Sequence, residues 1–159
     1  MTQRLDYIKQ APALFKKLVE FGGLVHDGAI EQSILDLVSI RASQINGCGF
    51  CLDMHVKQAV IHGERPLRLH HLPTWRESTL FIPRERAALA WTEALTTLSP
   101  TGVPDDLYER VRTQFSEKEL TDLTYEVMTI NAWNRVNVAF KPVPGSYDKE
   151  FGLDKANLA

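Results

Sequence analysis

Hydrophobic residues recur along most of this chain at the spacing of an α-helix. Residues three or four apart share one face of a helix, so an apolar stripe at this spacing predicts a helix with one buried side. Three such stripes are Ile30, Ile34, Leu37, Val38 and Ile45; Ala87, Trp91, Ala94, Leu95 and Leu98; and Leu120, Leu123, Val127 and Ile130. No segment shows the alternation between turn residues that is typical of a hairpin strand. The pattern therefore predicts an all-α protein.

Several residues indicate where these helices begin and end. Ser116 and Glu119 have the spacing of a capping box, and Pro83 suits the first turn of a helix. Gly63 and Pro100 are plausible stops. Shorter helices are predicted over residues 12–21, 48–62, 66–71 and 104–114.

The chain is long enough for one domain with one core and too short for two comfortable ones, since it has 159 residues. We therefore expect residues 1–159 to form a single helical bundle. The segment 141–159 is rich in proline and glycine and is expected to be an irregular tail, which lies across its own subunit or a neighbour. The residues that suggest this are Pro142, Pro144, Gly145 and Gly152.

Charge and hydropathy exclude some classes of partner. The chain has 18 basic and 20 acidic residues, so its net charge of −2 gives no electrostatic reason to expect nucleic acid or an anionic membrane as a partner. The longest apolar run, Ala87 to Trp91, is far shorter than the roughly 20 residues that span a membrane. The first residues do not read as a secretion signal, so a cytoplasmic protein is expected. There, paired cysteines are more often redox-active or metal-binding than structural disulfides.

Both cysteines lie in one short segment, INGCGFCLDMHVKQA, residues 45–59. The Asn-Gly pair at 46–47 is a strong break, after which a helix can begin. The residues that would then share one side of that helix are Cys48, Cys51, His55, Gln58 and His62. Cα atoms at positions i and i+3 of a helix lie about 5 Å apart, which is within disulfide range. The two cysteines can therefore close a disulfide without unwinding the segment.

The spacing also offers ways to activate a thiol. Cysteine reacts as the thiolate, and a free thiol, with a pKa near ~8.5, is mostly protonated in the cytoplasm. The positive end of the helix dipole favours a thiolate at Cys48, whereas His55, one turn from Cys51, can take the proton of that second thiol. Asp36, on the preceding helix, is the candidate to orient His55 if the two helices pack antiparallel across the turn at 46–47.

Other interpretations of this segment stay open. Free cysteines are often buried as small hydrophobic side chains, so the pair could simply fill the core. The cysteines and His55 also offer three zinc ligands, with Asp36 or His62 as a fourth, although structural zinc sites usually use two separated Cys/His pairs. No nucleotide-binding or serine-hydrolase motif is present. We therefore expect neither a metal nor a cofactor.

Three longer segments resemble a known family. ILDLVSIRASQINGCGFCLDMHVKQAVIHGE, WRESTLFIPRERAALAWTEALT and INAWNRVNVAF are similar to the core of the alkylhydroperoxidase AhpD-like group, within the carboxymuconolactone decarboxylase superfamily. The resemblance covers roughly residues 10–145. It implies an all-helical fold assembled as a homotrimer or homohexamer, with peroxide-reducing or disulfide-exchanging activity.

The resemblance also implies roles for four residues. Cys51 matches the thiol that attacks the peroxide, and Cys48 matches the one that resolves the sulfenic acid into a disulfide. His55 matches the histidine after the pair, and Asp36 stands at the position of a proton-relay glutamate. The decarboxylase branch does not rely on a CxxC pair, so the two cysteines argue against a lactone decarboxylase.

Two departures from the family pattern bear on the efficiency of peroxide turnover and on the natural reductant. Asp36 is one methylene shorter than the family's glutamate, and Gly49 and Phe50 stand where well-studied members have a histidine between the cysteines. Helix-dipole reasoning favours Cys48 as the more acidic thiol, but the family and His55 favour Cys51 as the attacking one, and we side with Cys51.

The sequence therefore predicts a thiol-dependent peroxidase that reduces hydroperoxides through a CxxC dithiol/disulfide cycle, with His55 and Asp36 managing the proton. A dithiol or thioredoxin-like reductant is the expected partner. The alternatives are a disulfide reductase with little peroxidase activity and a non-enzymatic or redox-sensing helical oligomer.

Overall fold

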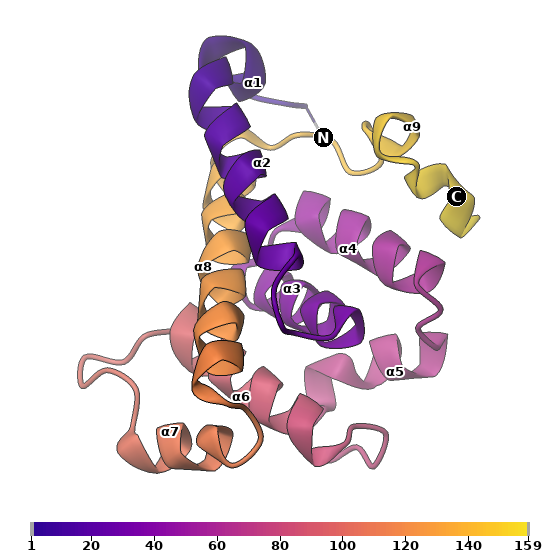
Figure 1. Ribbon diagram of the computed structural model, residues 1–159. Coiled ribbons are helices and arrows are strands. Elements are labelled where there is room, and N and C mark those ends of the chain that lie inside the picture. The colour runs from indigo at the N-terminus through magenta and orange to yellow at the C-terminus, as the bar shows by residue number, and fades with distance from the viewer. Residues whose placement is uncertain (1, 159) are drawn as a thin grey trace.

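The computed structural model describes residues 2–158 and is built from helices (Figure 1). The elements in chain order are α1 (Tyr7–Gln10), α2 (Pro12–His26), α3 (Gln32–Asn46), α4 (Gly49–Ile61), α5 (Pro66–His71), the 3₁₀ turn η1 (Leu72–Thr74), α6 (Pro83–Thr96), α7 (Asp105–Arg112), α8 (Glu117–Phe140), α9 (Asp148–Phe151) and the 3₁₀ turn η2 (Leu153–Ala156). Among these residues, β pairing is limited to an isolated bridge between Ser99 and Gly102. The all-α prediction is confirmed.

Helix α3 is the centre of the bundle. It packs against α4, α6 and α8, and α2 runs alongside α8 on the outside (Figure 1). Its apolar side chains Leu37, Val38 and Ile40 are all fully buried. A helix that is covered on several sides must also bury its polar residues, and α3 does bury Asp36, Ser39 and Ser43. These three polar residues need partners inside the protein.

The long helix α8 begins at the predicted capping box. The Ser116 hydroxyl accepts the backbone N–H of Glu119 at 3.3 Å, and the Glu119 carboxylate accepts the backbone N–H of Ser116 at 2.7 Å. The apolar stripe predicted for this helix is buried in full, from Leu120 to Ile130. Further along, α8 buries Asn134 and Asn137, which places amide groups opposite the end of α3.

Most helix boundaries differ from prediction by a few residues. The helix over 66–71 is confirmed, whereas the one predicted over 12–21 continues to His26. Leu98 does not belong to the buried stripe of α6, because that helix ends at Thr96 and Leu98 is exposed. Gly63 directly follows the C-cap of α4 with a φ of 91°, which confirms this predicted stop, whereas Pro100 lies four residues past the end of α6.

The C-terminal tail is more ordered than predicted. Residues 148–156 form α9 and η2, and η2 packs against α4 (Figure 1). The Tyr147 ring meets Phe50 edge-on, with ring centroids 6.0 Å apart, and Asp148 forms an ion pair with Lys57 at 2.7 Å. The tail therefore covers the helix that carries the cysteines; residue 159 lies outside the described residues.

Within residues 2–158, no helix is both long enough and apolar enough to cross a membrane.

Candidate active site

A tight turn places the first cysteine at the start of α4. Gly47 ends α3 with a left-handed φ of 65°, a conformation that glycine adopts without strain. Cys48 follows as the N-cap of α4, and its Sγ accepts the backbone N–H of Cys51 at 3.3 Å. Cys48 therefore lies just outside the helix rather than within its first turn, where it meets the free N–H groups of the helix end.

The two cysteines are free thiols in direct contact. Their sulfur atoms lie 2.6 Å apart, and each residue is only 2% exposed. A disulfide has an S–S length of about 2.0 Å, so bond formation needs little movement of either side chain. The predicted ability of this segment to close a disulfide without unwinding agrees with this geometry.

Asparagine side chains of α8 complete the hydrogen bonding of the pair. Asn137 Nδ2 donates to Cys51 Sγ at 3.2 Å, while its Oδ1 accepts the Tyr7 hydroxyl at 2.9 Å. The Asn134 Oδ1 accepts a hydrogen bond from Asn46 Nδ2 at 2.9 Å, so the oxygen end of the Asn134 amide faces Asn46. Asn137 therefore donates directly to sulfur, and Asn134, whose Nδ2 donates to Ser43 Oγ at 3.1 Å, lowers the pKa of Cys48; both effects stabilise a thiolate.

These contacts shift the pKa values of the two thiols in opposite directions. The pKa of Cys48 lies below its ordinary value, first because the Cys51 thiol donates a hydrogen bond to it, and further because of the Cys51 N–H and the Asn134 amide. The pKa of Cys51 is raised, because its proton is held toward Cys48 and because the thiol is buried. When the reduced pair loses one proton, the negative charge therefore belongs on Cys48 and the remaining proton on Cys51.

The two thiols also differ in their access to the neighbouring cavity, and here Cys51 is the favoured one. A cavity of about 420 Å³ opens beside the pair and is lined by Cys51 but not by Cys48. Its walls are largely aromatic, with Tyr7, Phe15, Phe50, Trp133, Tyr147 and Phe151. A small molecule in this cavity meets Cys51 first.

His55 lines the same cavity as a neutral imidazole. Burial lowers its pKa to about 4, so it is uncharged at neutral pH. Its Nδ1 lies 2.8 Å from Gln58 Oε1, and because that amide oxygen can only accept, Nδ1 carries the hydrogen. The free lone pair is then on Nε2, which makes His55 a proton acceptor in a defined tautomer.

The expected pairing of Asp36 with His55 is wrong. Asp36 Oδ2 instead contacts His62 Nδ1 at 2.8 Å, and Asp36 Oδ1 accepts Gln32 Nε2 at 3.0 Å. His62, the C-cap of α4, lies two turns beyond His55, so the short aspartate turns away from the cysteine cavity. The orienting role that the sequence gave to Asp36 falls to Gln58.

Sequence reasoning missed the amide groups of the site. Gln58 was on the predicted face of α4 but had no predicted role, and the asparagines of α8 were not considered. A signal for them exists in INAWNRVN, where Asn131, Asn134 and Asn137 recur every three residues on an otherwise apolar stripe. Polar residues at core spacing indicate buried hydrogen-bond partners.

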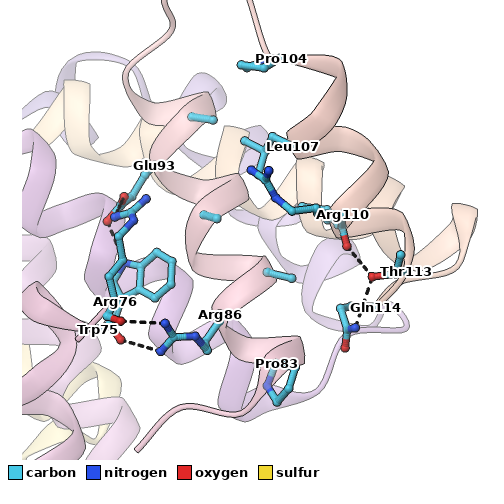
Figure 2. Close-up of a pocket in the computed structure, with 14 residues that line it drawn as sticks. Trp75, Arg76, Pro83, Arg86, Glu93, Pro104, Leu107, Arg110, Thr113 and Gln114 are labelled. Carbon is cyan, nitrogen blue, oxygen red and sulfur yellow. Dashed lines mark hydrogen bonds and ion pairs between the residues drawn. The ribbon is translucent and has the colours of Figure 1, made fainter. Parts of the chain in front are cut away.

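The structure has a second hollow, of about 850 Å³, between α6 and α7 (Figure 2). Arg86 lies along its wall, where its guanidinium donates to the backbone carbonyls of Trp75 at 2.9 Å and Arg76 at 2.8 Å. Neither a cysteine nor a histidine is among its lining residues. Thiol chemistry is therefore confined to the cavity beside Cys51.

Comparisons with known sequences identify relatives over most of the chain. The model of the carboxymuconolactone decarboxylase family matches residues 12–94. The uncharacterized protein YdfG of Bacillus subtilis (strain 168) is 37% identical over 139 residues, which cover 87% of this chain and 95% of YdfG. The uncharacterized protein YnjA of Escherichia coli (strain K12) is 33% identical over 110 residues, which cover 69% of this chain and 60% of YnjA.

Comparisons with solved structures identify the same fold. A protein of unknown function from Agrobacterium tumefaciens, ATU0492, described there as a proposed antioxidant defence protein AhpD, is 37% identical, with a TM-score of 0.87 over 90% of this chain and 98% of its own. An uncharacterized peroxidase-related protein with an AhpD core from Ralstonia eutropha JMP134 is 18% identical, with a TM-score of 0.78 over 88% of this chain and 75% of its own. The debrominase Bmp8 is also 18% identical, with a TM-score of 0.76 over 94% of this chain and 80% of its own. The last two similarities show the fold alone.

Proposed function

The chain belongs to the carboxymuconolactone decarboxylase family, and within that family we propose that it is an AhpD-like thiol peroxidase, which reduces hydroperoxides with its two cysteines. The observation that carries the proposal is the pair of free sulfur atoms 2.6 Å apart, of which only Cys51 lines the neighbouring cavity. A reactive thiol, a resolving thiol and a pocket for a small oxidant are the parts that a two-cysteine peroxidase needs.

In the first step, Cys51 loses its proton and attacks the hydroperoxide. The Cys48 thiolate, to which the Cys51 thiol is already hydrogen-bonded, takes that proton, and the neutral His55 offers Nε2 to the cavity as a hydrogen-bond acceptor. The Cys51 thiolate then forms an S–O bond as the O–O bond breaks, and the alkoxide that leaves takes the proton from Cys48, which is again a thiolate. The products are a Cys51 sulfenic acid and an alcohol, with all atoms and electrons accounted for.

In the second step, Cys48 resolves the sulfenic acid. Its thiolate attacks Cys51 Sγ, the S–S bond forms, and hydroxide leaves and becomes water when it takes up one proton. The short distance between the sulfur atoms favours this step, because neither side chain has to leave its place. A dithiol or thioredoxin-like reductant then restores both cysteines by thiol–disulfide exchange.

Peroxide consumption by the reduced protein tests the proposal. We would follow the loss of an organic hydroperoxide with a dithiol reductant present, for the wild type and for Cys51→Ser and Cys48→Ser. The expected result is turnover in the wild type and none in Cys51→Ser, with at most a single turnover in Cys48→Ser. Sustained turnover in Cys48→Ser would contradict the resolving role.

A redox sensor is the second candidate, and the burial of both sulfur atoms favours it. Each cysteine is only 2% exposed, which limits exchange with a protein reductant. In that case the disulfide would form once and persist. Stoichiometric oxidation without turnover, in the presence of the same reductant, would favour the sensor over the peroxidase.

A further inference from the structure

Helix α8 buries an acidic side chain that the cycle above does not use. Glu126 is 2% exposed, and its Oε1 accepts the Ser39 hydroxyl at 2.6 Å. Its other oxygen, Oε2, has no hydrogen-bond partner among residues 2–158. A buried carboxylate with one hydrogen bond is strongly disfavoured relative to the neutral acid, so this environment favours protonated Glu126.

A row of buried polar groups on α3 and α8 lies between Glu126 and the cysteines, and Ser39 takes part in it through its hydroxyl on one side and its backbone carbonyl on the other. Ser39, which donates to Glu126, offers its carbonyl to the Ser43 hydroxyl at 2.7 Å, and Ser43 Oγ accepts Asn134 Nδ2 at 3.1 Å. Asn134 in turn acts on the cysteine pair and lowers the pKa of Cys48. Glu126 and the Cys48 thiolate therefore belong to one polar seam between α3 and α8, shielded from solvent.

The charged groups around Glu126 lie on three helices. Asp36 of α3 raises the pKa of Glu126, and Asp36 in turn contacts His62, the C-cap of α4. His26 of α2 lowers the pKa of Glu126 and also acts on His55, and it lines the cysteine cavity. Burial outweighs the effect of His26, so the net shift of the Glu126 pKa is upward.

We propose that Glu126 stores the proton that Cys48 lacks as a thiolate and releases it when the Cys48–Cys51 disulfide forms. The reduced seam then holds one negative charge, on Cys48, and the oxidised seam also holds one, on Glu126. This inference rests on the proposed two-cysteine cycle, because it concerns the proton that the second step of that cycle requires.

The proton balance closes with this assignment. When Cys48 attacks the sulfenic acid, the departing hydroxide takes one proton, and protonated Glu126 is its source. When a dithiol reduces the disulfide, the dithiol loses two protons and two electrons. One of these protons stays on Cys51 and the other returns to Glu126, so Cys48 is again a thiolate.

Infrared difference spectroscopy between the reduced and the oxidised protein tests the proposal. Diamide serves as the oxidant: it takes two electrons and two protons as the disulfide forms and becomes a hydrazine. The reduced wild type is expected to show the C=O stretch of a protonated carboxyl group at neutral pH, and the oxidised protein is expected to lose it. Because diamide replaces the hydroperoxide, the result does not depend on whether the protein turns over peroxide.

Matched variants assign the band to one residue. Glu126→Gln should lack the band, whereas Glu117→Gln, an exposed glutamate on the same helix, and Asp36→Asn should keep it. Proton uptake gives a second readout. Oxidation of the wild type by diamide should take up almost no proton from solution, and oxidation of Glu126→Gln should take up one per disulfide.

Either of two results would overturn the proposal. One is the absence of any redox-dependent carboxyl band in the wild type, a measurement that needs no variant to fold. The other is a band, or a proton balance, that is the same in Glu126→Gln as in the wild type. A protein that shows the band but never turns over peroxide would instead refute the peroxidase and leave the stored proton established.

Discussion

At the scale of single residues, acidity and access belong to different cysteines. Cys48 is the more acidic thiol, because the hydrogen bonds converge on it, and Cys51 is the one that a molecule in the cavity can reach. A proton acceptor beside Cys51 removes this conflict, since the proton that Cys51 must lose can pass to the Cys48 thiolate, whose sulfur lies 2.6 Å away. The dipole argument and the family argument from the sequence therefore describe two different steps.

The Asn137 amide should support the attacking thiol. It donates to Cys51 Sγ at 3.2 Å, and a hydrogen bond to a charged group contributes about 1.5–3 kcal/mol. We expect Asn137→Ala to slow single-turnover oxidation of the thiols by peroxide about tenfold or more, since about 1.4 kcal/mol is a factor of ten. Stopped-flow measurement of the oxidation rate checks this.

Tyr7→Phe is the matched control, because it removes only the hydroxyl that holds Asn137 Oδ1. A smaller decrease is expected for it. An Asn137→Ala rate equal to that of the wild type would show that the amide does not stabilise the thiolate.

The partly buried His55 should make stability depend on pH. Its pKa falls from an ordinary 6.5 to about 4 on folding, so between these values the unfolded chain binds a proton that the folded protein does not. Stability contributed by this group is therefore present above pH ~6.5 and is lost as the pH falls toward 4. We expect the decrease in the urea midpoint between pH 7 and pH 5 to be smaller in His55→Gln.

His70→Gln controls for histidine content, since His70 is exposed. It should show the same decrease between pH 7 and pH 5 as the wild type. An equal decrease in His55→Gln would mean that burial does not perturb this imidazole.

The sequence predicted the residues of the site better than their partners. The spacing of Cys48, Cys51 and His55 follows from helix geometry, which is local, so their common side could be predicted. Whether Asp36 meets His55 or His62, two turns further along, depends on how α3 and α4 slide past one another, whereas the contact of His55 with Gln58 lies within α4. The role of Glu126 needs the packing of α8 against α3, which no local pattern contains.

At the scale of elements, the turn between α3 and α4 fixes the geometry of the cysteines. Gly47 has a φ of 65°, and a Cβ at this position would meet no atom within 4 Å. Backbone strain alone therefore opposes Gly47→Ala, and we expect a loss of about 1 kcal/mol in the free energy of unfolding. Urea denaturation measures this.

Gly49→Ala offers the opposite test two residues later. Gly49 is the first residue of α4, and a Cβ there comes no closer than 3.9 Å to Pro144. Alanine should therefore stabilise the protein by about 0.5–1 kcal/mol through its helix propensity. If both variants changed stability in the same direction, the left-handed conformation of Gly47 would not be the cause.

Helices were predictable as elements, but their ends were less so. The capping box of Ser116 and Glu119 is a local signal and correctly marks the start of α8. The end of α6 at Thr96 has no such signal, which is why Leu98 was wrongly placed on its buried stripe. The tail was predicted as irregular because its prolines and glycines are visible in the sequence, whereas its packing partners on α4 are not.

At the scale of the whole molecule, the C-terminal tail forms part of the cavity wall through Tyr147 and Phe151. Lys57 is buried and pairs with both Asp53 and Asp148, at 2.8 and 2.7 Å, which fastens α9 to α4. We expect Asp148→Asn to increase the rate at which a bulky maleimide labels Cys51, because the tail is then held less firmly. Quenched labelling followed by mass spectrometry gives the rate.

Glu150→Gln, an exposed change on the same short helix, should leave that labelling rate unchanged. If Asp148→Asn labelled no faster than Glu150→Gln, the ion pair would not limit access.

The homotrimer or homohexamer stays a prediction from family resemblance, which light scattering of the purified protein can decide.

The most direct test of the central claim is to identify which sulfur atom takes the oxygen. Cys48→Ser would be treated with one equivalent of hydroperoxide and then with dimedone, which traps sulfenic acids, and the labelled residue would be located by peptide mass spectrometry. The account predicts the adduct on Cys51. An unmodified Cys51 in this variant, together with rapid trapping on Cys48 in Cys51→Ser, would contradict it and make Cys48 the attacking thiol.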